Sequence, residues 1–479
     1  MTKKKIILVN LGLRRPLYPL ATPPMGILYL SAYLRRELKD LDICVINQRL
    51  ENYDVEELSK QISKFAPHII CLSTLTTFAY QLPNLVPLLR EVCPESWILL
   101  GGPHASAVRD NVFNDVDVDV VVPGEGEIAL KQIIESYPEK GNLQNIQGII
   151  WKSSDGQIIN NPGMLPMIEE LDELPFPAYD LIDLSRYWKH QSIAPIVRRK
   201  YVSLFSSRGC PYQCMWCHSI FGRKIRMHSA ERVVDEIEFF AKKYNVTDFE
   251  FLDDNFNFNQ RRVIEIAELV HKRGLKIELA FPTAIRGDIA TQEVIDAMHS
   301  IGTYLCGFSL ETGSPRLQKF TCKRLDIDKF LKAVEITAKK NIYITGFCMM
   351  GFPTETEEEL QQTIDVACKS RFHTASFFTV TPFPGTPLYE WVKENKPEKL
   401  EKLNYNNMDF SAMNVNLTDL PDKVLFSYQR KAMKKFYVDP IRIYRLLRSY
   451  PKPLLLPYYL PIFIHRATKG LWNSEKTNC

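Results

Sequence analysis

This sequence has no long hydrophobic run: no stretch of 18 or more apolar residues occurs in the chain, so we expect no membrane-spanning helix. Internal repeats and low-complexity tracts are also missing, which leaves the composition of an ordinary globular protein. Charge of one sign is not in excess, and a net charge of +4 gives no reason to expect a nucleic-acid partner. The basic start, Met1–Lys5, is followed by too short an apolar segment for a secretory signal, so we expect a cytoplasmic protein.

The cysteines lack the pairing typical of secreted proteins. There are eleven, an odd number, and most stand alone in apolar runs, as Cys44, Cys71 and Cys348 do. Isolated cysteines of this kind are typical of reduced thiols inside cells. The sequence therefore argues against a disulfide framework.

Three cysteines are grouped differently, in the run RGCPYQCMWCH from Arg208 to His218. Cys210, Cys214 and Cys217 have CxxxCxxC spacing, which can hold three irons of a [4Fe–4S] cluster and leave the fourth iron open, whereas electron-transfer clusters take four cysteines. A structural zinc site needs a fourth ligand. His218 is available, but beside Cys217 its geometry is awkward, so the spacing favours the cluster and leaves zinc as the alternative.

A CxxxCxxC motif after a strand-like run, Tyr201–Phe205, resembles the radical S-adenosylmethionine (SAM) enzymes. The preceding sequence resembles the cobalamin-binding branch of that superfamily, and the two resemblances cover residues 1–400. They imply an α/β protein with an N-terminal Rossmann-like cobalamin-binding domain, a partial (β/α)6 radical SAM barrel and a mainly helical C-terminal region. The implied cofactors are a [4Fe–4S] cluster, SAM and cobalamin.

Residues 1–140 alternate short apolar runs with amphipathic segments, which predicts a parallel sheet with helices on both faces. Such sheets bind ligands beyond the carboxyl ends of their strands. Each strand-end motif alone can be a tight turn, but the set resembles the family's cobalamin site. The predicted strands are 6–9, 43–46, 68–73, 97–100 and 119–122, the helices 25–39, 55–65, 82–92 and 127–137, and the motifs Ser73-Thr74, Gly101-Gly102-Pro103-His104 and Gly124-Glu125-Gly126-Glu127.

The first domain also departs from other cobalamin proteins. The run Pro23–Leu30 matches the opening usual in the family, but the DxHxxG motif, whose histidine replaces the lower axial base of cobalamin, is absent. By resemblance, His104 lines the cobalamin site without being an axial ligand. The alternative is that His104 only caps the following helix.

Residues 141–198 are predicted to be a linker with a hairpin at 148–160 and an extended passage at Leu174–Asp180. Residues 199–400 contain six strand–helix units, which close into a full or partial barrel with its chemistry at the carboxyl ends of the strands. The strands are expected near 202–206, 248–252, 276–280, 304–310, 343–350 and 375–379, and the helices from Ala230, Arg261, Thr291, Ile327 and Thr356.

The resemblance also places SAM contacts at these strand ends. It implies that Trp216 lies beside the adenine, that Asp253 lies near the SAM amino group, and that Glu311 contacts a ribose or a cation. Gly351 and Pro353 would form the turn that flanks the adenine. The ordinary alternative for Trp216 is packing of the loop.

Residues 401–479 form a basic, aromatic-rich region. Between Arg430 and Gly470 ten lysines and arginines accompany one acid, Asp439. A tail of this kind can lie on an anionic membrane surface, peripheral to the bilayer. It can instead cover the barrel mouth or pack as a solvated helix on its own domain.

The resemblance implies cleavage of SAM to a 5′-deoxyadenosyl radical, hydrogen abstraction from a small-molecule substrate, and methyl transfer from cobalamin, with electrons from a donor such as flavodoxin or ferredoxin. Methylation of an unactivated carbon in a small apolar metabolite is therefore the expected function. The overall layout resembles hopanoid methylases and anaerobic Mg-protoporphyrin ester cyclases, so oxidative ring closure or rearrangement stays open. A cobalamin-binding sensor without catalysis is the alternative from another class.

Overall fold

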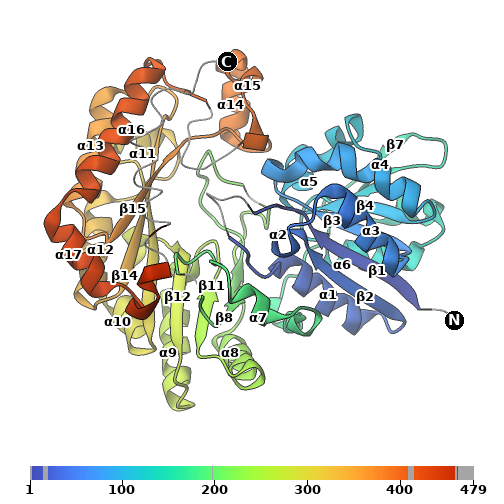
Figure 1. The fold of residues 1–479 in the computed structure, drawn as a ribbon, viewed down its shortest axis with the longest axis horizontal. Coiled ribbons are helices and arrows are strands. Elements are labelled where there is room, and N and C mark those ends of the chain that lie inside the picture. Colours follow the sequence, from blue (N-terminus) through green and yellow to red (C-terminus); the bar gives the residue numbers. More distant parts are fainter. Residues whose placement is uncertain are drawn as a thin grey trace.

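The computed structural model describes residues 3–14, 20–196, 198–218, 220–407, 415–458 and 461. Two sheets, each covered by helices, make up most of the chain (Figure 1): the first is parallel except for its last two strands, and the second is wholly parallel. This confirms the predicted α/β class. Among the described residues, no helix is long and apolar enough to cross a bilayer.

The first sheet has the strand order β2-β1-β3-β4-β5-β6-β7. Helices α3 and α4 pack on one face, and α1 and α6 pack on the other, because each buries an apolar stripe against the sheet. The strands are β1 (Lys4–Asn10), β2 (Leu41–Asn47), β3 (Ile69–Ser73), β4 (Trp97–Gly101), β5 (Val120–Val121), β6 (Ile150–Lys152) and β7 (Ile158–Asn160). The helices are α1 (Met25–Glu37), α2 (Gln48–Glu51), α3 (Val55–Phe65), α4 (Leu82–Val92), α5 (Gly102–Val108) and α6 (Glu127–Ser136).

The hairpin predicted in the linker forms, but it belongs to the first sheet. β6 pairs antiparallel with β5, where Val120 lies opposite Trp151 and Val121 opposite Ile150. This pairing covers the exposed backbone of a two-residue strand and buries Ile150 in the sheet core. The first sheet therefore continues past residue 140, where the sequence analysis ends the first domain.

The second sheet is a six-stranded open barrel with the order β15-β14-β13-β12-β11-β8. Along β14 the side chains alternate: Ile344, Cys348 and Met350 pack against the outer helices, while Phe347 and Met349 are half-buried on the inner face. The strands are β8 (Tyr201–Leu204), β11 (Asp248–Phe251), β12 (Glu278–Ile285), β13 (Thr303–Glu311), β14 (Tyr343–Met350) and β15 (Thr374–Thr379). The helices are α8 (Ala230–Tyr244), α9 (Gln260–Lys272), α10 (Gln292–Ser300), α11 (Pro315–Phe320), α12 (Ile327–Lys339), α13 (Glu357–Lys369), α14 (Pro387–Asn395), α15 (Pro397–Glu401), α16 (Asp422–Tyr437) and α17 (Pro440–Ser449).

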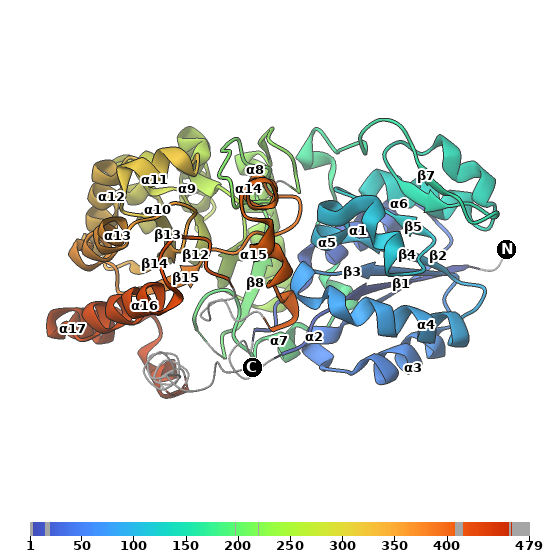
Figure 2. The ribbon, with the colours of Figure 1, turned by 90° about the horizontal axis from the view of Figure 1, so that it is seen from above.

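The two sheets are joined by the proline-rich passage and by the segment that contains α14 and α15. In that passage the Tyr179 hydroxyl donates to the carbonyl oxygen of Ser203 at 2.6 Å, so the linker lies directly against β8. A short helix, α7 (Leu184–Tyr187), follows. Figure 2 shows α14 and α15 at the junction of the two halves. Of the basic, aromatic-rich region 401–479, residues 408–414, 459–460 and 462–479 lie outside the described part of the chain.

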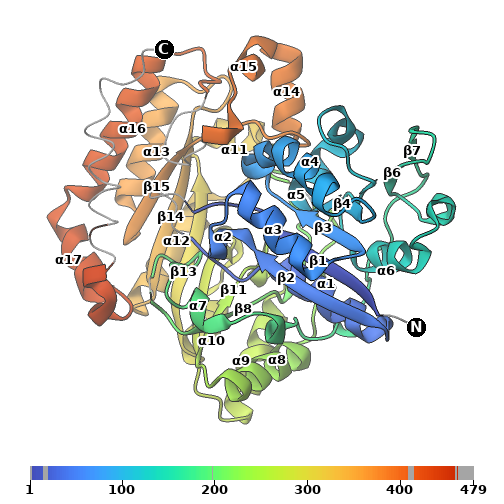
Figure 3. The same ribbon diagram turned by 45° about the vertical axis from the view of Figure 1, so that its right-hand side comes forward.

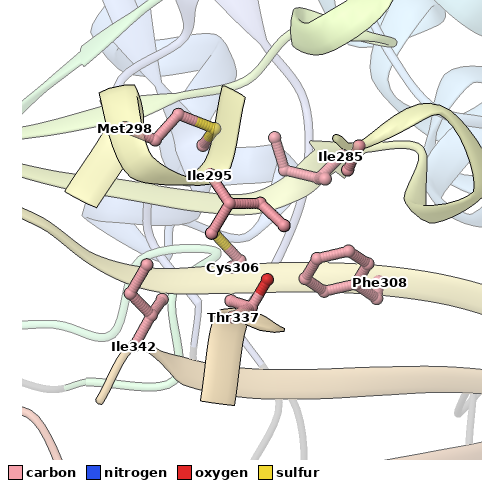
Figure 4. A pocket seen from close by; sticks show the side chains of 8 residues that line it. Ile285, Ile295, Met298, Cys306, Phe308, Thr337 and Ile342 are labelled. Carbon is pink, nitrogen blue, oxygen red and sulfur yellow. The ribbon is translucent and has the colours of Figure 1, made fainter. Parts of the chain in front are cut away.

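A small cavity in the barrel wall is not the functional site (Figure 4). Its volume is about 10 Å³, which is enough for one water molecule at most. Its lining is almost wholly apolar and lies in the layer between the strands and the outer helices. The side chains are Ile285, Ala290, Ile295, Met298, Cys306, Phe308, Thr337 and Ile342.

His373 makes the fold sensitive to acid. It is buried, its Nδ1 accepts a hydrogen bond from the Ile344 amide at 2.9 Å, and burial lowers its pKa to about 4. Below the ordinary histidine pKa, His373 is protonated in the unfolded chain but stays neutral in the folded chain. The free energy of unfolding therefore decreases as pH falls toward 4. We expect His373→Asn to lose about 2 kcal/mol less stability than the wild type between pH 7 and pH 5, measured by urea unfolding. Equal losses in the two proteins would contradict this role.

Candidate functional site

The cysteine loop leaves the barrel after β8 and returns to it before α8. Its base is the two-stranded ladder of β9 (Ser207–Arg208) and β10 (Arg226–Met227). Gly209 starts the loop with φ of +87°, and a Cβ there would lie 2.4 Å from the carbonyl oxygen of Lys224. Only glycine fits such a close backbone approach. The loop can therefore turn sharply just before Cys210.

The three thiols of the motif lie near one another. Cys210 and Cys214 are half-buried, and Cys217 is accessible to solvent. Burial is the main reason that the pKa of Cys217 is raised, to about 12, and repulsion from Cys214 and Cys210 adds to it.

The chemistry of the cysteine loop fits a [4Fe–4S] cluster. Cys210, Cys214 and Cys217 are three thiols in one loop, and each thiolate of a cluster binds a different iron. A structural zinc site would need a fourth ligand at the same point.

Glu311 and Lys323 form an ion pair beside the thiols. Glu311 ends β13 with φ of +63°, a strained conformation for this residue, and its Oε1 accepts from Lys323 Nζ at 3.1 Å. Both side chains are almost fully buried. The charge of Lys323 lowers the pKa of Cys214 against the stronger effect of burial. The prediction that the end of this strand contributes a carboxylate to the site agrees with this placement.

The acids after β11 point in different directions. Asp253 is fully buried and accepts hydrogen bonds from the Ser206 and Ser207 hydroxyls, so it holds the chain just before the cysteine loop. Asp254 is accessible, and it raises the pKa of Cys210 in addition to burial. Loss of hydration, followed by the charge of Asp253, raises the pKa of Asp254 to about 6. The structure therefore brings Asp254, not the predicted Asp253, to the thiols.

Trp216 lies against the turn after β14. Its ring centroid is 5.3 Å from that of Phe352, which stands between Gly351 and Pro353 in the sequence. Glu355, which the sequence reasoning missed, holds this turn: its Oε2 accepts from the Gly351 amide at 2.6 Å and from the Phe352 amide at 3.0 Å. The residues predicted to flank the adenine are thus brought together in one place.

Arg286 is a second residue that sequence reasoning missed. Its guanidinium carbon lies 3.6 Å from the centroid of the Tyr212 ring in the cysteine loop, and its Nη2 donates to the carbonyl oxygen of Lys323 at 3.0 Å. Its charge lowers the pKa of both Cys210 and Cys214, against the larger effect of burial. Arg286 directly follows β12, so its place at a barrel strand end was the available signal.

The carboxyl edge of the first sheet carries small and hydroxyl-bearing residues. Ser73 and Thr74 end β3, and Gly101 and Gly102 end β4 and begin α5, followed by Pro103. His104 contacts the Thr76 hydroxyl at 3.3 Å, and burial lowers its pKa to about 4, so the imidazole is neutral near pH 7. We call this edge of the sheet the cradle, because its small residues would allow the close approach of a large flat ligand such as cobalamin.

Glu125 and Glu127, predicted to line the same cradle, are engaged elsewhere. Glu125 Oε2 accepts from Arg208 Nη1 at 2.9 Å, and Glu127 Oε1 accepts from Arg208 Nη2 at 2.7 Å. All three side chains are buried. The other two residues of the Gly124–Glu127 motif are glycines: Gly124 adopts a φ of +122°, and Gly126 directly precedes α6.

The cradle lies on the side of the first sheet that is turned toward the barrel. The strands of the first sheet begin on the outer side, where the N-terminus lies, and run toward the barrel (Figure 1). Arg208, two residues before Cys210, binds Glu125 and Glu127, which follow Gly124 of the cradle. Gly385, in the loop after β15, packs against α5: a Cβ on it would lie 3.0 Å from the Ala107 Cα. Both candidate cofactor regions therefore lie at the junction between the two sheets.

Gly102 gives a test of the cradle. Its φ is +80°, and an added Cβ would lie 2.4 Å from Ser73 Oγ. We expect Gly102→Ala to lower the free energy of unfolding by about 1–3 kcal/mol and to weaken cobalamin binding, measured by thermal unfolding and by absorbance titration. Gly26→Ala is the control, because a Cβ there meets no atom within 4 Å; as a helical glycine replaced by alanine it should not lower the free energy of unfolding, and it should leave cobalamin binding unchanged. If Gly102→Ala and Gly26→Ala gave the same stability and the same cobalamin binding, the close approach of Gly102 to Ser73 would be refuted.

Comparison with known proteins agrees with this division of the chain. Residues 18–134 match the B12 binding domain, and residues 204–367 match the radical SAM superfamily. An uncharacterized methyltransferase of Pyrococcus horikoshii is 30% identical over 421 residues, which is 87% of this chain and 88% of that protein. The chain belongs to the cobalamin-binding branch of the radical SAM superfamily.

Other members show the same architecture. Cytidylyl-2-hydroxyethylphosphonate methyltransferase of Streptomyces wedmorensis is 27% identical, over 80% of this chain and 81% of that protein. The solved structure of the cobalamin-dependent SAM radical enzyme OxsB, with aqua-cobalamin and SAM bound, superposes with a TM-score of 0.73 at 18% identity. It covers 98% of this chain and 72% of that chain, so the likeness shows the shared fold.

Membership of this branch decides the cofactors and the class of protein. This radical SAM protein is an enzyme, and its cofactors are a [4Fe–4S] cluster, SAM and cobalamin. The similar proteins support placing it in the family of cobalamin-dependent radical SAM methyltransferases. These findings confirm the predicted family, cofactors and enzyme class.

Proposed function

We propose that this radical SAM enzyme methylates an unactivated carbon of a small, largely apolar metabolite. The observation that carries the proposal is the meeting of the cobalamin cradle and the cysteine loop at one junction. The inner face of the barrel supports an apolar substrate, because half-buried Phe347 and Phe378 stack there at 6.1 Å between ring centroids. The cofactors, when bound, supply a carbon radical from SAM and a methyl group from cobalamin.

The chain's own residues would hold these groups in place. Cys210, Cys214 and Cys217 would bind three irons and leave the fourth for the amino and carboxylate groups of SAM. Asp254 takes the role predicted for Asp253 and would accept a hydrogen bond from the SAM ammonium. Glu311 would contact the ribose, and its ion pair with Lys323 orients the carboxylate.

The remaining contacts come from the turn and from the cradle. Trp216 and the turn Gly351–Pro353 would form the apolar wall beside the adenine. The cobalamin cradle would consist of Ser73, Thr74, Gly101, Gly102, Pro103, His104 and Gly124, with no lower axial ligand assigned. Flavodoxin or ferredoxin is the proposed electron donor.

Product analysis tests this function. We would reconstitute the protein anaerobically with iron, sulfide and cobalamin, add reductant and SAM, and quantify 5′-deoxyadenosine and S-adenosylhomocysteine. Both products, with deoxyadenosine lost in Cys210→Ala, are expected of a radical methyltransferase. Deoxyadenosine without S-adenosylhomocysteine would favour ring closure, the activity named for a cyclase of Rubrivivax gelatinosus that is 22% identical over 87% of this chain. Firm cobalamin binding with neither product, even with candidate substrates, would favour the sensor.

We further propose that α17 contacts an anionic membrane surface at the cytoplasmic face. α17 lies at the outer side of the barrel, away from the first sheet (Figure 3). Buried Arg442 anchors it by donating to the carbonyl oxygens of Phe372 and Cys368 at 2.5 and 2.6 Å. α17 also exposes apolar side chains beside basic ones, the pattern of an interfacial helix. The exposed apolar residues are Ile441, Ile443, Tyr444 and Leu447 on α17 and Val438, Leu454 and Tyr458 in the flanking segments; the neighbouring basic residues are Arg448 on α17 and Lys431, Lys434 and Lys435 on α16.

Vesicle sedimentation tests this contact. The protein should bind phosphatidylserine-containing vesicles more tightly than phosphatidylcholine vesicles, and Leu447→Glu should reduce that binding by at least about fivefold. Met164→Glu is the control, since Met164 is 79% exposed and distant in sequence from α17. Equal binding by both variants would contradict the proposal.

A further inference from the structure

Two arginines face each other at the base of the cysteine loop. In the β9–β10 ladder, Arg208 lies directly opposite Arg226, and both side chains are buried. Like charges at directly opposed positions of an antiparallel pair repel each other. Closing the loop at this point therefore requires negative charge from elsewhere in the chain.

That negative charge comes from the first domain. Glu125 lies in the loop between β5 and α6 and accepts hydrogen bonds from both arginines, through Oε2 from Arg208 and through both oxygens from Arg226. Glu127 adds a bond from Arg208 at 2.7 Å. These four residues, each at most 6% exposed, carry two positive and two negative charges and so form a neutral buried cluster.

Neighbouring contacts fix the geometry of this cluster. Arg226 Nη1 also donates to the carbonyl oxygen of Ile168 at 2.6 Å, and the Arg208 guanidinium lies over the rings of Tyr29 and Phe221. Tyr29 belongs to α1 of the first domain and Phe221 to the cysteine loop itself. The arginines are therefore packed from both domains and have little freedom to find other partners.

The other side of the loop is attached to the barrel. The Met215 amide donates to the carbonyl oxygen of Thr321 at 3.0 Å, and the Leu388 amide donates to the carbonyl oxygen of Met215 at 2.8 Å. The base of the loop is bound from both domains: Asp253 and Arg262 of the barrel bind the segments that flank it, and Glu125 and Glu127 of the cobalamin domain bind its two arginines. Movement of that domain would act directly on the start and the end of the loop.

We propose that Glu125 and Glu127 are positioning residues that clamp both ends of the cysteine loop to the cobalamin domain, and that they do not serve as cobalamin ligands. The clamp would fix the position of the cluster relative to the cobalamin cradle. This inference rests on the proposed function only in assuming that the cysteines hold the cluster. It also explains why the third strand-end motif has two acids, which a neutral cradle does not require.

Cluster properties measured in the absence of cobalamin separate the two roles. We would reconstitute wild type, Glu127→Gln and Glu125→Gln with iron and sulfide alone, then record the EPR spectrum of the reduced cluster and the rate of iron loss to a chelator. A clamp predicts an altered spectrum and iron loss faster by at least about tenfold in both variants, because unpaired buried arginines loosen the loop base. A residue that only binds cobalamin would leave both measurements unchanged.

The chain offers a matched control. Glu169 pairs with Lys224 of the same loop at 2.6 Å, but both side chains are more than half exposed. Exposed ion pairs contribute little, so Glu169→Gln should behave as the wild type. If Glu127→Gln had the same EPR spectrum and the same rate of iron loss as Glu169→Gln, the proposed clamp would be overturned.

Further measurements keep the inference testable if one variant folds poorly. Far-UV circular dichroism identifies misfolded protein, and Arg208→Lys, which keeps the charge but loses the two-pronged contact, should give the same spectral change as Glu127→Gln. The double variant that combines Arg208→Lys with Glu127→Gln should lose iron no faster than the faster of the two single variants, because the two residues act through the same contact. Additive effects would overturn the clamp. Wild-type protein that takes up no cluster would instead count against the proposed function.

Discussion

Replacing Arg199 by methionine is expected to lower the free energy of unfolding by about 3–5 kcal/mol. Arg199 is fully buried at the amino ends of the barrel strands, where its guanidinium donates to Asp248 at 2.9 Å, to Glu250, and to the Ser192 hydroxyl at 2.9 Å. Methionine fills a similar volume but leaves two buried carboxylates without their main partner. Urea unfolding of the cofactor-free protein measures the loss.

A second pair of charges serves as the control for Arg199. Arg261 pairs with Glu265 on the surface of α9, and its side chain is 90% exposed. Arg261→Met should change stability by less than about 1 kcal/mol, because water screens the pair. Similar losses in the two variants, or no loss in Arg199→Met, would contradict the account of the barrel base.

Replacing Cys214 by alanine is expected to reduce 5′-deoxyadenosine formation to background. With two thiolates left, the cluster loses one of its three protein ligands, and the iron needed to bind SAM is no longer held in place. The measurement is iron and sulfide content together with deoxyadenosine after anaerobic reconstitution. The variant should still bind cobalamin, since the cradle lies on the other sheet.

Cys322 is the matched control for Cys214. It is a half-buried thiol next to Lys323, close to the same loop but outside the CxxxCxxC motif. Cys322→Ala should keep the cluster and most of the deoxyadenosine formation. Loss of the cluster in Cys322→Ala, or its retention in Cys214→Ala, would show that the ligand set is different.

Much of the fold could be predicted because its signals are local. Alternating apolar runs and amphipathic segments predicted both parallel sheets, and the helix starts follow from capping residues such as Ser229, Thr291 and Thr356. The pairing of the hairpin with β5 is not local. Nothing in residues 148–160 shows which strand they will pair with, so the hairpin was assigned to the linker.

The site shows the same division between local and distant signals. The three cysteines are defined by spacing within one loop, so the sequence located them. Asp253 and Asp254 are neighbours, and only the three-dimensional course of the chain after β11 decides which one faces the thiols. The arginine partners of Glu125 and Glu127 are more than eighty residues away in the sequence, and no spacing rule connects them.

The most direct test of the central claim, that both cofactors lie at one junction between the two sheets, is EPR spectroscopy of the doubly loaded protein. We would compare protein that carries reduced cluster and cob(II)alamin together with proteins that carry each alone. Two sites that face each other across the junction should couple, so the spectrum of the doubly loaded protein should show broadening or splitting absent from the single spectra. A spectrum equal to the sum of the two single spectra would contradict the shared junction.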